Sequence, residues 1–205
     1  MPLIVFEGID GCGKTTQVDR LCAHLERERV AHRRLREPGG TVLGEAMRRM
    51  LLDPATKAAP VAELFGYLQA RAQLCDEVLA PALARHETVI LDRFYHSTIA
   101  YQAFGLGLDR ERVRAAIELA IGRVKPDVVI WLDLEPAEAE RRRDAVRAHD
   151  RIEARGLAYL QRVHAGYHAL AEEGELQRVD ARMNVDDLEQ LIWTLIAPLV
   201  APPVR

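Results

Sequence analysis

Hydrophobic residues along this chain follow two alternating patterns. Short continuous apolar runs, such as the one within Leu3–Glu7, are typical of strands buried on both faces of a sheet. Longer segments carry apolar residues every three or four positions, as at Val18, Leu21, Cys22 and Leu25 after the first run, which is typical of amphipathic helices. This alternation predicts a parallel sheet whose strands are connected by helices.

The pattern assigns most of the chain to specific elements. The predicted strands are Leu3–Glu7, Arg33–Arg36, Thr88–Asp92, Val128–Leu132 and Leu176–Asp180. The predicted helices are one that begins near Lys14, then Val42–Leu52, Val61–Arg85 with a bend near Pro81, Asp109–Gly122, Glu135–Arg143, one that ends near Glu172, and Asp186–Val200. Together they predict a single α/β domain over residues 1–205, a three-layer α/β/α sandwich with a five-stranded parallel sheet.

A glycine-rich segment between the first strand and the first helix matches the phosphate-binding pattern GxxxxGK[ST]. Its residues are Gly8-Ile9-Asp10-Gly11-Cys12-Gly13-Lys14-Thr15, followed by Thr16, and we assign all of them to nucleotide binding. Backbone N–H groups of such a loop converge on phosphate oxygens, Lys14 reaches the β- and γ-phosphates, and the Thr15 hydroxyl can ligate Mg²⁺. A glycine-rich turn without a ligand is the weaker alternative, since every position matches in the expected context.

The loop alone does not define the reaction. Asn184 is the only asparagine of the chain, so the NKxD motif of ordinary GTPases cannot occur. Arg36 ends the second predicted strand, and Asp92 and Arg93 follow the third, where open α/β sheets bind ligands. Asp92 could hold Mg²⁺ or its waters, and Arg93 could bind a phosphate through two hydrogen bonds. A solvated arginine and a surface ion pair are the alternatives.

Two arginine-containing patterns allow both a structural and a functional interpretation. Glu63, Tyr67 and Arg71 share one face of a predicted helix, which is either a stacking surface for a flat base or an ordinary half-buried face. The segment at about 141–153 is either a solvated helix end or a lid that closes over a transferring phosphoryl group. Its arginines are Arg141, Arg142, Arg143, Arg147 and Arg151.

Composition narrows the function classes. The 28 basic and 31 acidic residues give a net charge of −3, which argues against a general nucleic-acid-binding protein. The number of cysteines is odd and none are in CxxC spacing, so neither a disulfide framework nor a zinc site is indicated; they are Cys12, Cys22 and Cys75. Apolar runs are too short for a membrane span, and the first residues lack the basic start of a signal peptide. We therefore expect a cytoplasmic protein.

Together these motifs resemble the thymidylate kinase family over nearly the whole chain. The motifs are Phe6-Glu7-Gly8-Ile9-Asp10-Gly11 with the P-loop, Arg36-Glu37-Pro38-Gly39-Gly40, Arg71-Ala72-Gln73, Asp92-Arg93-Phe94, Ser97 with Ala100-Tyr101-Gln102, Leu132-Asp133 with Pro136, and Asp150-Arg151-Ile152-Glu153. The resemblance implies the P-loop nucleoside monophosphate kinase fold and transfer of the ATP γ-phosphoryl group to dTMP with Mg²⁺, giving dTDP and ADP for dTTP synthesis. It also implies a homodimer.

The resemblance further implies roles on the acceptor side. Asp10 would contact the 3′-hydroxyl of the acceptor, and Arg36 and Arg93 would bind its phosphate. Tyr67 stands where the family usually has a phenylalanine that stacks on thymine. The remaining implied substrate-binding residues are Arg71 and Thr98 near the base, Tyr101 against the 2′ position, and Ser97 and Gln102 beside the nucleotide.

The main departure from the family pattern concerns the position of the catalytic arginine. Some members carry it in the P-loop, but this chain has no arginine between Gly8 and Gly13, so it is similar to the bacterial type with a basic lid. Arg142 and Arg151 fit the lid pattern, whereas one usual position is Val146, with Arg147 beside it. The catalytic set implied by the resemblance is Lys14, Arg93, Arg142, Arg147 and Arg151, with the particular lid arginine left open. Leu106, at a position where arginine is frequent, is a second departure.

Three other functions are compatible with a P-loop. A kinase on the same scaffold could act on another nucleoside monophosphate or on a deoxynucleoside. A regulatory ATPase module would bind ATP without an acceptor. A structural protein with a vestigial loop is disfavoured, because Lys14 and Thr15 are both intact.

Overall fold

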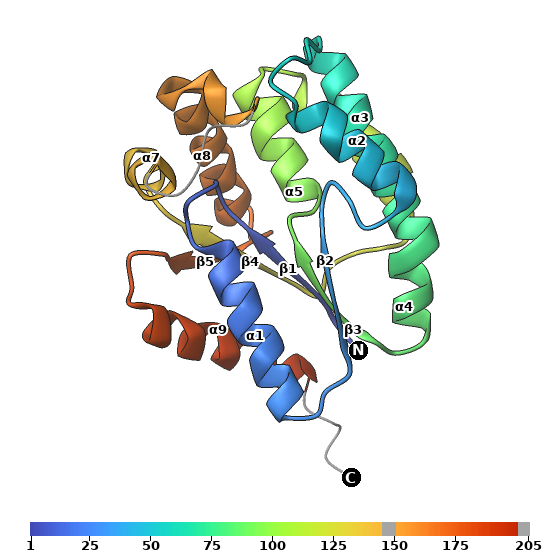
Figure 1. Cartoon of the computed structure of the whole chain (residues 1–205), viewed down its shortest axis with the longest axis vertical. Helices are drawn as coiled ribbons and strands as arrows, with labels where there is room; N and C mark the ends of the chain where they lie inside the picture. The colour runs from blue at the N-terminus through green and yellow to red at the C-terminus, as the bar shows by residue number, and fades with distance from the viewer. Residues whose placement is uncertain (145–150, 201–205) are drawn as a thin grey trace.

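A five-stranded parallel sheet forms the centre of the molecule, and this confirms the predicted three-layer α/β/α architecture. The computed structural model describes residues 1–144 and 151–200. The strand order is β2-β3-β1-β4-β5. The bounds are β1 Leu3–Glu7, β2 His32–Arg36, β3 Thr88–Asp92, β4 Val128–Asp133 and β5 Gln177–Asp180. Helices cover both faces of the sheet (Figure 1).

The central strands are the ones that the apolar runs predicted best. β1 is buried along its whole length, with Leu3, Ile4, Val5 and Phe6 fully shielded from solvent. The edge strands β2 and β5 expose most of their side chains, which is why their sequence pattern is weaker. Phe6 pairs with Asp92 of β3 and with Ile130 of β4, so the carboxyl ends of the central strands lie at one edge of the sheet.

The helices follow the predicted order with local differences. On one face, α1 (Lys14–Arg27) packs against α9 (Val185–Val200), side by side in Figure 1. The other helices are α2 Val42–Leu52, α3 Pro60–Leu74, α4 Ala80–Ala84, α5 Tyr95–Thr98, α6 Arg110–Ile121, α7 Pro136–Asp144 and α8 Leu157–Glu172, with a short 3₁₀ turn η3 at Glu153–Arg155. Within the described residues, no helix combines the length and apolar character that a membrane span requires.

The helix expected over Val61–Arg85 is interrupted by one wider turn. A π-helical segment, η1 at Cys75–Leu79, separates α3 from α4. Pro81 lacks a backbone N–H and cannot continue regular helical hydrogen bonding, and a π segment just before it accommodates this loss. A second π segment, η2 at Ile99–Gly105, follows α5, and the sequence pattern had assigned no element there. Both π segments contribute buried residues to the interior.

Two P-loop glycines allow close contact with neighbouring backbone. Gly11 has a φ of 90°, and a Cβ atom there would lie 2.3 Å from the Ala139 carbonyl oxygen on α7. Gly8 has a φ of 136°, and its Cβ would lie 2.7 Å from the carbonyl oxygen of Leu132 on β4. Both φ values favour glycine, and neither contact leaves room for a side chain. The glycines thus bring the loop against β4 and α7.

Candidate active site

The P-loop presents the amino end of α1 to a cavity. Gly13 adopts a left-handed conformation with φ 97° immediately before the helix, which leaves the hydroxyls of Thr15 and Thr16 exposed in the first turn. Lys14 is only 6% exposed, and its Nζ donates hydrogen bonds to the carbonyl oxygens of Gly8 (2.8 Å) and Ile9 (3.2 Å). Helix amino ends and buried ammonium groups both favour phosphate.

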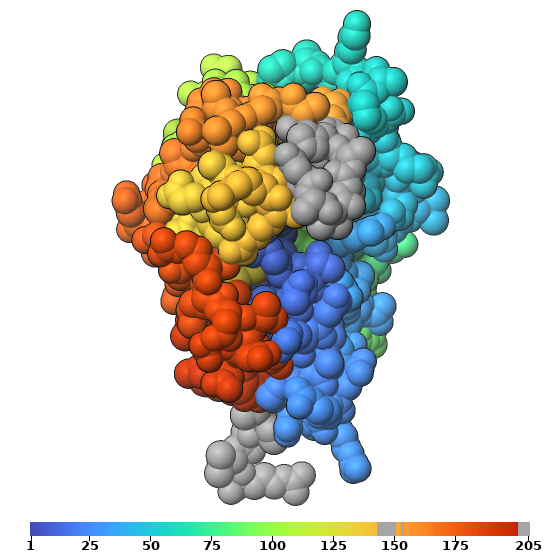
Figure 2. Space-filling view, turned by 60° about the vertical axis from the view of Figure 1, so that its left-hand side comes forward, coloured from blue at the N-terminus to red at the C-terminus, as the bar shows by residue number. Residues whose placement is uncertain are grey.

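This P-loop cavity has a mainly cationic lining. Asp92 and Arg93 reach it from the end of β3, and Arg36 from the end of β2. Arg142 reaches it from α7, the yellow helix that borders the blue P-loop and α1 region in Figure 2. The P-loop contributes Asp10, Gly11, Gly13, Lys14, Thr15 and Thr16. Ile9 and Cys12 are instead buried in the core, where burial raises the pKa of the Cys12 thiol.

A second, inner cavity adjoins the first. The two cavities share Asp10, Glu37, Arg48 and Arg93, so a ligand in each would meet at these side chains. The rest of its lining includes Tyr67, Arg71, Phe94, Ser97, Thr98, Tyr101 and Gln102.

Arg93 lies at the junction of the two cavities and is held from several sides. Its Nη2 donates to Asp10 Oδ1 at 3.0 Å and to the Tyr101 hydroxyl at 3.3 Å, and its Nη1 donates to Ser97 Oγ at 3.1 Å and to the Tyr167 hydroxyl at 3.3 Å. Its backbone has φ 70°, an uncommon conformation for a side chain of this size. The guanidinium is therefore fixed before any ligand binds.

Glu7 supports the turn that carries Arg93. Its carboxylate is fully buried at the end of β1 and accepts hydrogen bonds from the backbone N–H of Phe94 (2.8 Å) and of Ser97 (3.1 Å). It also accepts from Ser97 Oγ at 2.6 Å and from the Tyr167 hydroxyl at 2.8 Å. These bonds connect β1, the segment after β3, and α8 around one carboxylate.

One wall of the inner cavity depends on a buried ion pair. Arg71, on α3, is 2% exposed, and its Nη2 lies 2.6 Å from Glu37 Oε2. The same guanidinium donates to Thr98 Oγ1 at 2.8 Å and to the Phe94 carbonyl oxygen at 3.2 Å. Arg71 thus connects the turn after β2 to α5 while its edge lines the cavity.

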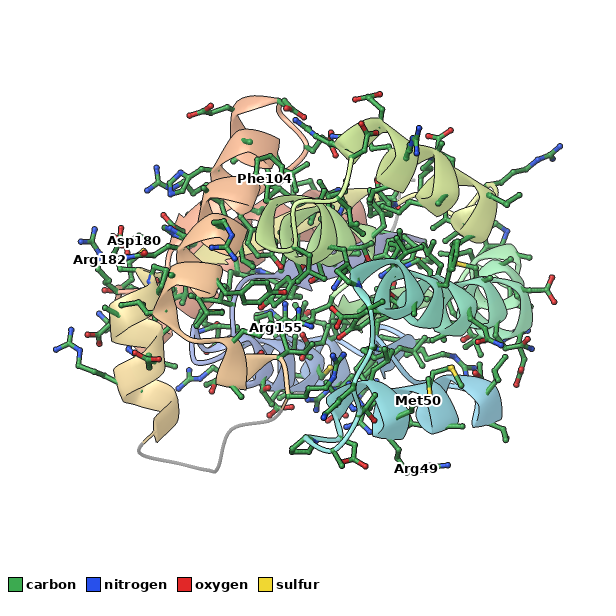
Figure 3. All side chains as sticks on the ribbon, turned by 90° about the horizontal axis from the view of Figure 1, so that it is seen from above. Arg49, Met50, Phe104, Arg155, Asp180 and Arg182 are labelled. Carbon is green, nitrogen blue, oxygen red and sulfur yellow. The ribbon has the colours of Figure 1, made fainter. Side chains whose placement is uncertain are left out.

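A second buried ion cluster surrounds Glu63, which is fully shielded from solvent. Arg151 Nη2 lies 2.7 Å from Glu63 Oε2, Arg155 also pairs with it, and Gln102 Nε2 donates to Oε1 at 3.0 Å. Figure 3 shows Arg155 in the interior, in contrast to Arg49 and Arg182 at the periphery. Burial alone would raise the pKa of Glu63, but the arginine hydrogen bonds and charges outweigh it and hold the pKa below its usual range.

The arginines of the expected lid therefore occupy different places. Arg142 pairs with Glu138 at 3.0 Å, donates to the Ala181 carbonyl oxygen and lines the P-loop cavity. Arg151 donates to the Leu51 carbonyl oxygen as well as to Glu63, which places it beside α2 and α3. Arg147 lies outside the described residues.

One buried oxygen at the P-loop cavity suits a cation. Asp92 Oδ1 is shielded from solvent and has no hydrogen-bond partner among residues 1–144 and 151–200. Asp92 and Thr15 both line the P-loop cavity. A carboxylate and a hydroxyl are ligand types that Mg²⁺ prefers, so the residues present fit this ion.

Comparison with known proteins agrees with this geometry. The family model for thymidylate kinase matches residues 6–192. A thymidylate kinase of Gloeobacter violaceus is 45% identical, with 94% of this chain and 93% of that protein covered. Another, of Chlorobium chlorochromatii, is 41% identical, with 98% of this chain and 100% of that protein covered. The chain belongs to the thymidylate kinase family.

Sequence reasoning missed several residues of this thymidylate kinase site. Glu37 and Arg48 line both cavities. Glu37 stood in the motif Arg36–Gly40 but received no role, and Arg48 stood in no motif. Glu7 and Tyr167 come together from 160 positions apart. Glu7 carried a signal of its own, because it is a carboxylate at the end of an apolar strand and such a group needs internal hydrogen-bond donors.

We predict that Glu63→Ala lowers the free energy of unfolding by about 3–5 kcal/mol, because it leaves two buried arginines without their carboxylate. Glu118→Ala is the matched control: Glu118 pairs with Lys125 at 3.4 Å, but their side chains are 71% and 54% exposed, so its loss costs at most about 1 kcal/mol. Urea unfolding at pH 7 measures both, and equal losses would contradict the prediction.

The effect of Glu63 should also depend on pH. A carboxyl group whose pKa is lowered by folding stabilises the protein above its unfolded pKa of about 4.3, and this stabilisation is lost as the pH falls through the folded value. The difference in the free energy of unfolding between wild type and Glu63→Ala should therefore become smaller as the pH falls below about 4.3.

Proposed function

We propose that this chain transfers the γ-phosphoryl group of ATP to the 5′-phosphate of dTMP, giving dTDP and ADP. The observation that carries the proposal is the pair of adjoining cavities, which meet at Asp10 and Arg93. One cavity is lined by six P-loop residues, including Lys14 and Thr15, and the other by polar and aromatic side chains suited to a nucleotide. Family membership supports dTMP as the acceptor.

Positioning and charge stabilisation account for the reaction in this proposal. The acceptor phosphate is already an anion at neutral pH, so a strong general base is unnecessary. Lys14 and the P-loop N–H groups hold the donor phosphates, and Arg93 and Arg36 hold the acceptor phosphate. Arg142, together with Arg147 of the segment outside the described residues, would stabilise charge on the transferring group, and closure of this lid would exclude water.

The proposal includes Mg²⁺, held by Thr15 and by Asp92 directly or through water. When bound, the ion would neutralise charge on the donor phosphates. We assign Asp10 to the acceptor sugar, because its Oδ1 contacts Arg93 and so lies at the junction of the two cavities. In the inner cavity, Tyr67 offers a ring against a base, and Thr98 and Gln102 offer hydrogen bonds at its edge.

We further propose a cytoplasmic location. Cys12, Cys22 and Cys75 are all free thiols, and two of them are buried. A reducing compartment keeps cysteines in this state.

The proposed homodimer would form through α2, α3 and α6. α3 packs against both of its neighbours, so the three helices make one continuous layer. The layer exposes Val42 and Met50 on α2, Val61 and Phe65 on α3, and Leu119 on α6, and Leu119 is 88% exposed. Exposed apolar side chains on adjacent helices favour a protein–protein interface, and in a symmetric dimer the same surface serves both subunits.

An ADP-release assay with dTMP, dUMP, dCMP, AMP and thymidine tests the activity. We expect release to depend on the acceptor and to be fastest with dTMP. Lys14→Ala should lower turnover by orders of magnitude, because the ammonium group no longer reaches the donor phosphates, whereas the exposed Lys57→Ala should not. Release that ignores the acceptor would indicate an ATPase module, and a preference for AMP would indicate another kinase.

We predict that Tyr101→Ala relaxes the discrimination between UMP and dTMP, because Tyr101 is 7% exposed and lines the inner cavity. The ratio of kcat/KM for UMP over dTMP should rise by about tenfold or more. Tyr101→Phe keeps the ring and loses only the hydroxyl bonded to Arg93, so it should lower activity without changing this ratio. Equal ratios in all three proteins would refute the steric role.

Phe65→Asp should convert the dimer into a monomer, since Phe65 is 60% exposed on the proposed interface and a carboxylate there would be buried against the partner. Met183→Asp is the control, because Met183 is exposed near the start of α9, away from the three helices. Analytical ultracentrifugation measures both. A monomeric wild type, or a dimer unaffected by Phe65→Asp, would contradict the assignment.

A further inference from the structure

A cluster of three metal-ligating side chains lies outside the two cavities described above. Asp133 ends β4, and His164 and His168 stand one helical turn apart on α8. One ligand atom from each of the three lies within 4.8 Å of the others. The closest pair is Asp133 Oδ1 and His164 Nε2, at 2.6 Å. Two histidines at i and i+4 are a common way for a helix to offer two metal ligands from one face.

The carboxylate is already oriented toward the histidines. Arg178 of β5 donates to Asp133 Oδ2 from Nε at 2.7 Å, and its Nη2 also lies 2.6 Å from that oxygen. The opposite oxygen, Oδ1, faces His164. Metal-binding groups are usually held by such outer hydrogen bonds, which fix the ligand without occupying the ligating atom.

Access to the cluster is open on one side. The side chains of Asp133 and His164 are each about one-tenth exposed, whereas His168 is half-buried and reaches solvent. The Trp131 ring packs edge-on against the imidazole of His168, with 4.8 Å between ring centroids, and the two imidazoles lie 4.6 Å apart. His168 is therefore the ligand through which an ion would enter from solvent.

The cluster is separate from the proposed Mg²⁺ position. Asp92 belongs to β3 on one side of β1, and Asp133 belongs to β4 on the other side. Neither histidine lines the P-loop cavity or the inner cavity. Imidazole nitrogens with a single carboxylate also suit zinc and its neighbours better than Mg²⁺, which prefers oxygen ligands.

We propose that Asp133, His164 and His168 bind one first-row divalent transition-metal ion, such as Zn²⁺, through two imidazole nitrogens and one carboxylate oxygen. The fourth position is left to water. The ion takes the place of the hydrogen now shared by His164 and Asp133. Three protein ligands and an open position are a usual arrangement for zinc.

An ion bound at this site would be attached to α8, the helix that supports Arg93. Tyr167 lies between His164 and His168 on α8, and its hydroxyl contacts both Glu7 and Arg93. An ion that joins α8 to β4 holds this helix in place. Binding to the folded state alone also raises the unfolding temperature as the concentration of the ion rises.

Titration of chelator-treated protein with Zn²⁺ by isothermal calorimetry, without nucleotide, tests the proposal. We expect one equivalent to bind and excess Mg²⁺ not to displace it. His168→Ala, at the exposed side of the cluster, should weaken binding by more than about tenfold, since loss of even an outer orienting partner costs about 10–100-fold. His32→Ala, on β2, is the matched control and should bind as wild type does.

Fluorescence gives an independent measurement at the site itself. The chain has two tryptophans, and Trp193→Phe leaves Trp131 as the only one. Ni²⁺ should then quench Trp131 emission saturably, and less so when His168→Ala is added. Absence of saturable binding, equal affinity in His168→Ala, or equal weakening in His32→Ala would each overturn the proposal, and none of these outcomes depends on kinase activity.

Discussion

The rest of the site depends on the hydrogen bonds made to the buried carboxylate of Glu7. Glu7 stands at the end of the central strand and accepts hydrogen bonds from the turn after β3 and from Tyr167 on α8. A carboxylate removed from water is costly unless donors surround it, so these bonds permit only one arrangement of the three segments. That arrangement fixes Arg93 in an uncommon backbone conformation, directed at Asp10.

The same principle shapes the inner cavity. Arg71 with Glu37, and Glu63 with Arg151 and Arg155, are buried pairs that connect elements distant along the chain. Such pairs contribute little net stability compared with apolar packing, but losing one partner is costly. Their effect here is to hold polar groups at defined places around a cavity. A few polar groups held at fixed places give a pocket its specificity and set the orientation of a ligand.

Charge around the two cavities is organised before any ligand binds. The chain carries a net charge of −3, yet Lys14, Arg36, Arg48, Arg93 and Arg142 all face the P-loop cavity. Several of these cations already contact a carboxylate, as Arg93 does with Asp10 and Arg36 with Glu45. Their orientation is therefore set without the phosphates. Such preorganisation lowers the cost of stabilising charge when a phosphoryl group is transferred.

The sequence by itself determined the fold. Apolar runs and helical spacing predicted the five strands and the order of the helices, because burial of these patterns is a local property of the chain. The P-loop was equally visible, since its eight residues are contiguous along the chain. The π-helical turns were not visible, because they arise where Pro81 and tertiary packing override the regular helical period.

Only the tertiary structure decided which charged residues share a site. Arg151 matched a lid pattern, yet the fold pairs it with Glu63, whose own pattern indicated either a stacking surface for a base or an ordinary helix face. Glu7 meets Tyr167, and Asp133 meets two histidines of α8, because parallel strands place their ends side by side and the crossover helices pack back over them. Side chains on different elements are brought together by that packing, and no local pattern in the sequence records it.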